Sequence, residues 1–162
     1  MTIATDAAAF RRIIGHYPTG VCAVTASTSA GAPVGMIVGS FTSVSLEPML
    51  VGFFPDRSSS TWPQIEAAGH FCVNVLSDQQ GPVCKALAAK GDAKFAGIDY
   101  RRSELGAPII DGALAWIDCD IHAVHEAGDH FFVLGRVRDL DLHAAGEPLV
   151  FHKGGYSRVV TI

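Results

Sequence analysis

The chain has 162 residues, of which 49% are hydrophobic and 17% are charged, and its formal net charge is −4. This length predicts a single domain over residues 1–162, and the apolar composition excludes a disordered protein. The negative charge argues against nucleic acid or an anionic membrane as the main partner. Because the charge content lies below the roughly 25% of an average soluble protein, we expect a homodimer that covers part of the surface.

No apolar run approaches the roughly 18 residues of a membrane-spanning helix, and the first ten residues contain no basic residue. We therefore expect no membrane span, no signal peptide and a cytoplasmic location. The cysteines form no CxxC pair, and the histidines lack metal-ligand spacing, so we expect no metal site. Three of the four cysteines, Cys22, Cys72 and Cys119, lie in apolar runs, where a free cysteine behaves as a small buried hydrophobic residue.

The N-terminal third predicts one helix followed by strands. Residues 5–17 carry apolar side chains at helical spacing, with Thr5 or Asp6 as the cap and Pro18 as the end. A glycine-proline turn then separates two expected strands, and a short buried strand follows. These strands are expected over residues 21–27, 34–44 and 49–54.

The rest of the chain predicts two short helices among further strands. Residues 115–123 alternate between apolar and polar side chains, as in a half-buried strand, and a turn at 127–129 leads into a return strand over 130–142. Helices are expected over 61–68 and 79–89, and other strands over 70–76, 148–152 and 156–162. Seven or so strands with few helices predict a mainly β protein, a closed β-barrel with its helices outside.

One segment combines an arginine with a run of hydroxyl side chains. Arg57 is followed by four consecutive hydroxyl residues, and the predicted helix begins at the last of them, Thr61. Hydroxyls and free backbone N–H groups at a helix start can bind a phosphate. The spacing of Thr61 and Gln64 also matches a capping box, in which the two side chains only cap the helix. Both interpretations remain open on this segment alone.

Two further segments are candidates for ligand contacts. Gly35 and Gly39 leave the backbone bare within a predicted strand, which is typical of a ligand or another backbone approaching closely, although a bulged strand also explains them. Gly128 and Asp129 suit a tight hairpin turn. That turn does not require the histidine that follows, His130.

Taken together and in order, these segments resemble the short-chain flavin reductase family over roughly residues 10–156. The matching motifs are PTGV at 18–21, GM at 35–36, SFTSVSLEP at 40–48, FCVNVL at 71–76, KFAG at 94–97, GDH at 128–130, GRV at 135–137 and PLVF at 148–151. The resemblance implies an FMN-binding split β-barrel and an NAD(P)H:flavin oxidoreductase. It also implies a separate flavin-dependent oxygenase as partner, and residues 94–119 look most like reductases that serve hydroxylases of aromatic or steroid rings.

The same resemblance implies where the flavin, FMN or FAD, would bind. It suggests contacts with the flavin ring along residues 33–40, the flavin phosphate near residues 58–61, and NADH or NADPH near His130 and residues 151–156. His130 is the implied catalytic residue. The implied cofactor-binding residues are Thr19, Pro33, Val34, Gly35, Met36, Ile37, Gly39, Ser40, Phe54, Asp56, Ser58, Ser60, Thr61, Lys94, Phe95, Phe151, His152 and Tyr156.

Two positions depart from the family pattern, and two rival functions remain. Ile37 stands where the family often has Thr or Ala, and Gly39 where it often has Asn, Ser or Gln, so backbone or water contacts replace side-chain contacts with the flavin there. One rival is a non-catalytic flavin carrier on the same barrel. The other is an enzyme resembling pyridoxamine-phosphate oxidases, which predicts a basic phosphate cluster that the 12 lysines and arginines of this chain do not supply.

Overall fold

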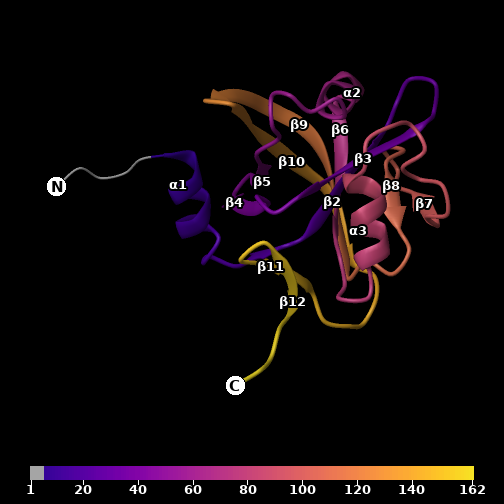
Figure 1. The fold of residues 1–162 in the computed structure, drawn as a ribbon. Helices are drawn as coiled ribbons and strands as arrows, with labels where there is room; N and C mark the ends of the chain where they lie inside the picture. Colours follow the sequence, from indigo (N-terminus) through magenta and orange to yellow (C-terminus); the bar gives the residue numbers. More distant parts are fainter. Residues whose placement is uncertain (1–5) are drawn as a thin grey trace.

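The computed structural model describes residues 6–162, which form three helices and twelve strands (Figure 1). The helices are α1 (Ala7–Ile14), α2 (Trp62–Ala68) and α3 (Gly81–Ala88). The strands are β1 (Thr19–Gly20), β2 (Cys22–Ser27), β3 (Pro33–Val38), β4 (Thr42–Leu46), β5 (Met49–Phe53), β6 (His70–Val75), β7 (Tyr100–Arg102), β8 (Pro108–Ile110), β9 (Ala115–Ala127), β10 (His130–Leu142), β11 (Leu149–His152) and β12 (Gly155–Arg158). The predicted mainly β fold is confirmed.

A seven-stranded antiparallel sheet forms the body of the molecule, in the order β3-β2-β6-β9-β10-β5-β4. The two end strands, β3 and β4, are consecutive in the chain and are connected by residues 39–41. The expected continuous strand over 34–44 is therefore wrong, because the chain changes from one end of the sheet to the other in its middle. The expected closed barrel is also wrong, because β3 and β4 do not pair: the result is a split barrel, in which the chain rather than a hydrogen-bonded ladder links the ends.

The two longest strands, β9 and β10, form a hairpin that crosses the sheet. Close packing at one glycine fixes this hairpin against β6: a Cβ atom at Gly135 would lie 2.4 Å from Cζ of Phe71. Phe71 also meets the edge of Phe53 with ring centroids 5.1 Å apart, and Phe53 meets Trp62 at 5.9 Å. Such edge-to-face contacts favour one arrangement of the core. Gly135 is therefore required by packing.

All four cysteines are free and buried, which confirms the prediction for Cys22, Cys72 and Cys119. Burial raises the pKa of the Cys22 thiol and of the Cys119 thiol to about 12. A thiol with so high a pKa holds its proton at neutral pH, and the thiolate is the reactive form. These cysteines therefore serve as core side chains.

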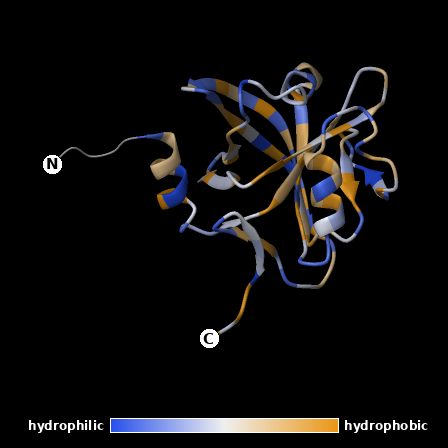
Figure 2. Cartoon of the chain, viewed as in Figure 1, coloured by the Kyte–Doolittle hydropathy of each residue, from blue (hydrophilic) through white to orange (hydrophobic). Residues whose placement is uncertain are grey.

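The N-terminal helix differs from the expectation in length and in packing. It spans Ala7–Ile14, and Asp6 caps it by accepting a hydrogen bond from the backbone N–H of Ala9 at 2.6 Å; the alternative cap, Thr5, lies outside the described residues. Figure 1 shows α1 standing apart from the barrel, and Figure 2 colours part of it as hydrophobic. Its apolar side chains are exposed, including Phe10 at 67% and Ile13 at 65%.

Sequence patterns missed three short strands, β1, β7 and β8, because two or three residues are too few to show an alternation. The helix bounds differ by one or two residues from those predicted for α2 and α3. No helix in residues 6–162 has the length and apolarity needed to cross a membrane.

The start of α2 is capped by a different residue from the one predicted. Ser59 Oγ accepts hydrogen bonds from the backbone N–H groups of Thr61 at 3.2 Å and Trp62 at 3.1 Å. Thr61 makes no side-chain cap, and Gln64 Nε2 instead donates to the carbonyl of Ser60 at 3.1 Å. The capping-box interpretation is therefore wrong, because Ser59 already satisfies the helix start and leaves the Thr61 hydroxyl for another partner.

Replacing the observed cap should cost stability. We expect Ser59→Ala to lower the free energy of unfolding by about 1 kcal/mol, because two backbone N–H groups lose their acceptor. Ser60→Ala is the matched control, since the exposed Ser60 hydroxyl caps nothing and should change stability by less than about 0.5 kcal/mol. Urea denaturation measures both values. Equal losses in the two variants would contradict the assignment of Ser59 as the cap.

A buried carboxyl group predicts a pH-dependent stability. Asp118 on β9 is 1% exposed, and neither side-chain oxygen has a hydrogen-bond partner among residues 6–162. Burial raises the pKa of Asp118 above its usual value of 3.8. The folded chain therefore keeps this proton to a higher pH than the unfolded chain does. Stability should fall as the pH rises from about 3.8 through the raised pKa of the folded state.

The variant Asp118→Asn should lack this component, because an amide cannot ionise. We expect it to be more stable than the wild type by about 1–3 kcal/mol at pH 8, with a smaller difference at pH 4. Urea denaturation at the two pH values measures the difference. Asp111→Asn, at an exposed acidic residue, is the control and should follow the wild type. A difference that does not change with pH would show that folding leaves the pKa of Asp118 unshifted.

Candidate functional site

The loop between β5 and α2 presents the predicted hydroxyl residues in a defined conformation. Asp56 holds its start by accepting hydrogen bonds from the backbone N–H and the hydroxyl of Ser58, both at 2.7 Å. These two hydrogen bonds lower the pKa of Asp56, so the carboxylate is ionised at neutral pH. Ser60 is exposed, whereas Thr61 is buried. The loop therefore offers hydroxyls toward one side of β3.

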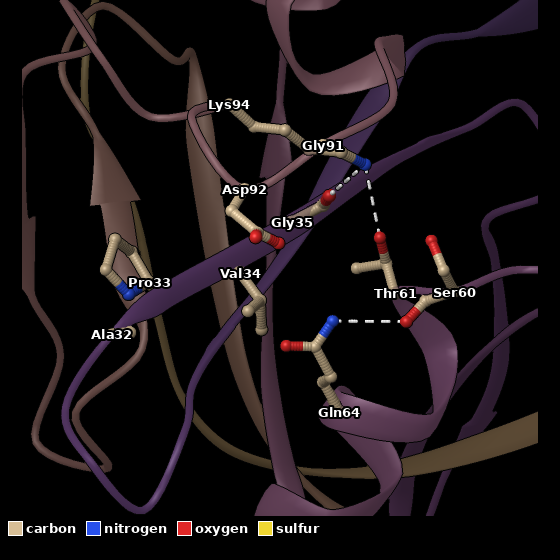
Figure 3. Close-up of a pocket in the computed structure, with 10 residues that line it drawn as sticks. All are labelled: Ala32, Pro33, Val34, Gly35, Ser60, Thr61, Gln64, Gly91, Asp92 and Lys94. Atoms are coloured by element: carbon tan, nitrogen blue, oxygen red, sulfur yellow. Dashed lines mark hydrogen bonds between the residues drawn. The ribbon is translucent and has the colours of Figure 1, made fainter.

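Lys94 links this loop to β3. Its Nζ donates to Thr61 Oγ1 at 3.1 Å and to the carbonyl oxygen of Gly35 at 3.4 Å, as Figure 3 shows. Partial burial lowers the pKa of the Lys94 ammonium. A desolvated ammonium beside hydroxyl groups is a suitable partner for an anion such as a phosphate.

Phe95 supports the position of Lys94. A Cβ atom at Gly35 would lie 3.1 Å from Cζ of Phe95, so the ring packs directly on the bare backbone of β3. Phe95 also meets Tyr100 edge to face, with ring centroids 5.5 Å apart. Gly35 and the loop that carries Lys94 and Phe95, which were both predicted as flavin contacts, thus pack against each other.

Two cavities flank the Lys94–Thr61 hydrogen bond. The larger has a volume of about 540 Å³ and extends between β3 and the C-terminal end of α3. The smaller has a volume of about 310 Å³ and lies beside the first residues of β3 (Figure 3). Three residues, Ser60, Thr61 and Lys94, line both cavities. Met36, Ile37 and Ser58 line the larger one, whereas Pro33, Val34 and Gly35 line the smaller one.

A further pocket, of about 280 Å³, lies where the chain leaves β3, and Thr19, Gly39 and Ser40 are among the residues that line it. The hydroxyl oxygen of Thr19 is buried and has no hydrogen-bond partner among the described residues. A Cβ atom at Gly39 would lie 2.8 Å from that oxygen, which explains the glycine at this position. Ser40 Oγ accepts a hydrogen bond from the backbone N–H of Phe54 at 3.0 Å.

The tip of the β9–β10 hairpin lies against the hydroxyl loop. Asp56 and His130 form an isolated β-bridge, and the backbone N–H of Arg57 donates to the carbonyl of Asp129 at 2.9 Å. The imidazole Nδ1 of His130 lies 2.7 Å from Asp129 Oδ1. His130 is therefore next to the residue that orients Ser58, a proximity across more than 70 positions that the sequence did not reveal.

Three predicted residues lie elsewhere, on the β11–β12 hairpin. Phe151 pairs with Thr19 in the ladder between β11 and β1, and the Tyr156 hydroxyl lies 2.9 Å from Cys84 Sγ. Neither these two residues nor His152 lines the two cavities beside Lys94. The prediction also missed residues that do line them, among them Gln64, Lys90 and Asp92. The polar run around Lys90 and Asp92 was the only signal for them, and it is typical of any surface loop.

Comparisons with known proteins show which family the chain belongs to. The model of the flavin reductase like domain family matches residues 14–159. A flavin reductase of Pseudomonas putida is 58% identical over 98% of this chain and 94% of its own. The reductase subunit HsaB of a flavin-dependent monooxygenase from Mycobacterium tuberculosis (strain CDC 1551 / Oshkosh) is 45% identical over 98% of this chain and 86% of its own.

Solved structures show the same similarity. Nitrilotriacetate monooxygenase component B from Mycobacterium thermoresistibile superimposes with a TM-score of 0.92 at 45% identity, covering 97% of this chain and 88% of its own. The NADH:FAD oxidoreductase SgcE6 of Streptomyces globisporus, in complex with NAD and FAD fragments, gives 0.91 at 35% identity, covering 99% and 96%. The family model matches most of the chain, and one relative is 58% identical to it. The chain therefore belongs to the flavin reductase family.

Proposed function

We propose that residues 1–162 form one flavin reductase domain that oxidises NADH or NADPH, reduces a flavin and releases it to a separate oxygenase. Relatives support this assignment, since several are reductase subunits of flavin-dependent monooxygenases and one is an NADH-dependent FMN reductase. The observation that carries the proposal is the Lys94 ammonium, which donates to the Thr61 hydroxyl at the wall between two cavities that Ser60 also lines. These three groups have the charge and donors that a flavin phosphate needs.

The surrounding residues fit the remainder of a flavin. The larger cavity adjoins the exposed edge of β3 at Met36 and Ile37, where backbone groups are available to a pyrimidine ring. The orphaned hydroxyl of Thr19 and the bare Gly39 continue the same edge. We assign the phosphate to the hydroxyl loop and the ring to this edge. The backbone N–H of Phe54, which donates to Ser40 Oγ, supports the end of this edge beyond Gly39.

The chemistry asks little of the side chains beyond binding and orientation. A bound flavin supplies the acceptor for the hydride that leaves the nicotinamide ring. Lys94, Ser60 and Thr61 fix one end of the flavin, and the β3 backbone fixes its orientation. Holding two reactants in the correct orientation contributes up to ~7–11 kcal/mol. His130, at the hairpin tip beside the loop, positions the nicotinamide nucleotide, and no proton transfer by His130 is needed.

Exposed apolar side chains on and after α1 support a homodimer. The apolar face of α1 is exposed, with Ile14 53% exposed, and Tyr17 just after the helix is 75% exposed. The low charge content of the chain, 17%, argues in the same direction. A second copy of the chain would cover this face.

Removing the Lys94 ammonium should weaken the binding of FMN, which carries a phosphate, and leave the binding of riboflavin unchanged. We expect Lys94→Met to raise the Kd for FMN about 10-fold, because a hydrogen bond to a charged partner is lost. The Kd for riboflavin, which lacks the phosphate, should stay within twofold. Lys85→Met on the exposed side of α3 is the matched control. Calorimetric titration measures each Kd, and an equal loss for riboflavin would contradict a phosphate partner.

Removal of the imidazole should affect the nicotinamide nucleotide alone. We expect His130→Ala to lower kcat/KM for NADH or NADPH by roughly 5- to 150-fold, which corresponds to one oriented contact. The Kd for FMN should not change. His122→Ala, on the same hairpin, is the control. Steady-state oxidation at saturating flavin measures the effect, and wild-type kcat/KM in the variant would make His130 a solvated hairpin residue. A wild type that binds flavin without oxidising either nucleotide would be a flavin carrier.

A substitution that introduces a charged side chain on α1 tests whether this helix forms the dimer interface. We expect the wild type to sediment as a dimer at micromolar concentration and Ile14→Glu to sediment as a monomer, because the charge would be buried in the interface. Ala8→Glu places the same charge on the opposite side of the helix and should leave the dimer intact. A monomeric wild type, or equal behaviour of the two variants, would contradict this interface.

A further inference from the structure

The β11–β12 hairpin lies outside the seven-stranded sheet (Figure 1). It forms a second sheet with β1, in which β11 pairs with β1 over two residues. Leu149 of β11 is buried, whereas all four residues of β12 are exposed. Two side chains of β12 nevertheless reach other elements. Arg158 forms an ion pair with Asp78 at 3.3 Å, and the Tyr156 hydroxyl lies 2.9 Å from Cys84 Sγ.

The contact between Tyr156 and Cys84 joins this exposed hairpin to the core. Cys84 on α3 is fully buried and belongs to the same hydrophobic cluster as Leu87, one turn later in the helix. The hydrogen bond with Cys84 raises the pKa of Tyr156, so the phenol keeps its proton at neutral pH and can donate to the sulfur. The Tyr156 ring also meets the edge of Phe151, with ring centroids 5.7 Å apart. One side chain thus holds both strands of the hairpin against α3.

The two elements that this contact joins both contribute to the proposed site of the flavin ring. Leu87 on α3 lines the larger cavity together with Ile37. Phe151 on β11 pairs with Thr19 on β1, and the buried hydroxyl of Thr19 continues the edge of β3. A Cβ atom at Gly39 would lie 2.8 Å from this hydroxyl, so a small displacement of β1 changes the space beside the edge. The contact between Tyr156 and α3 therefore controls the position of Thr19.

We propose that Tyr156 and Cys84 are positioning residues for the flavin ring, which act through β11 and Thr19 rather than by touching the flavin. Tyr156 thereby has a different role from the direct cofactor contact that the family resemblance implied. The inference rests on the proposed function, because it takes the ring to lie along β3 and beside Thr19.

The physical basis of this effect is the population of the binding-competent conformation. A hairpin released from Cys84 leaves Thr19 in the correct position for only part of the time, and the apparent Kd for the flavin rises in proportion. The phosphate end of the site, at Lys94 and Thr61, does not depend on this contact. Flavins with and without a phosphate are therefore affected equally.

The test measures the Kd for riboflavin and the Kd for FMN in variants of the full chain, by calorimetric titration. Tyr156→Phe removes the hydroxyl, and Cys84→Ala removes its partner. We expect each variant to raise both Kd values about fivefold, which corresponds to the loss of one neutral hydrogen bond. The double variant should bind no more weakly than either single variant, because both changes remove the same contact. Cys84→Ser keeps a partner for the phenol and should stay within twofold of the wild type.

Cys72→Ala is the matched control for the loss of a buried thiol. Cys72 is as fully buried as Cys84 but packs in a separate cluster with Ile109 and Trp116. Cys72→Ala should therefore lose stability in urea denaturation and leave both Kd values unchanged. Circular dichroism checks that each variant is folded. Tyr156→Phe changes an exposed side chain, so it decides the question even if a cysteine variant does not fold.

The possible outcomes separate this inference from the proposed function. Unchanged Kd values in Tyr156→Phe, or an equal rise in Cys72→Ala, overturn the positioning role and leave the flavin site intact. A raised Kd in Tyr156→Phe with a wild-type Kd in Cys84→Ala would mean that the phenol contacts the flavin itself, and a rise for FMN alone would place the effect at the phosphate; both results overturn the inference. A wild type that binds neither riboflavin nor FMN would instead refute the proposed function, and with it the ring site.

Discussion

The exposed edge of β3 is the constraint on which the site depends. β3 ends the seven-stranded sheet and pairs only with β2, so one row of its backbone N–H and C=O groups has no strand partner. An unpaired edge invites pairing with any other chain and is usually covered. Here the loop after α3 covers part of it, through the Lys94 contact to the Gly35 carbonyl and the Phe95 ring on Gly35. The remaining edge is free to bind a polar ring.

The same edge explains why the site needs glycines rather than functional side chains. At Gly35 and Gly39 the neighbouring Phe95 and Thr19 lie close enough to exclude a Cβ atom. At Gly39, which is exposed, the backbone groups stay accessible, whereas Gly35 is buried under the Phe95 ring. A protein that only orients two cofactors needs such a surface more than it needs acids, bases or nucleophiles.

Charge is concentrated where the phosphate is proposed to bind. The chain has a net charge of −4, yet one partly buried ammonium, that of Lys94, contacts the Thr61 hydroxyl on the wall between the cavities. Charged hydrogen bonds are stronger than neutral ones, particularly away from bulk water. A single lysine can thus hold a phosphate moderately, which suits a flavin that must leave for an oxygenase.

The sequence by itself determined the class of fold and most of its strands, because the alternation of side chains over β9 and β10 and the apolar runs of β2 and β6 are local properties. It also determined the family, through motifs that span the chain in order. Tertiary structure decided the cap of α2, since the competition between Ser59 and Thr61 depends on Lys94, which is more than 30 residues away. It also decided the break in the strand predicted over 34–44, because residues 39–41 carry the chain from one end of the sheet, β3, to the other end, β4. The smaller cavity was equally hidden, because only folding brings the loop at residues 91–94, the start of β3 and the first turn of α2 together.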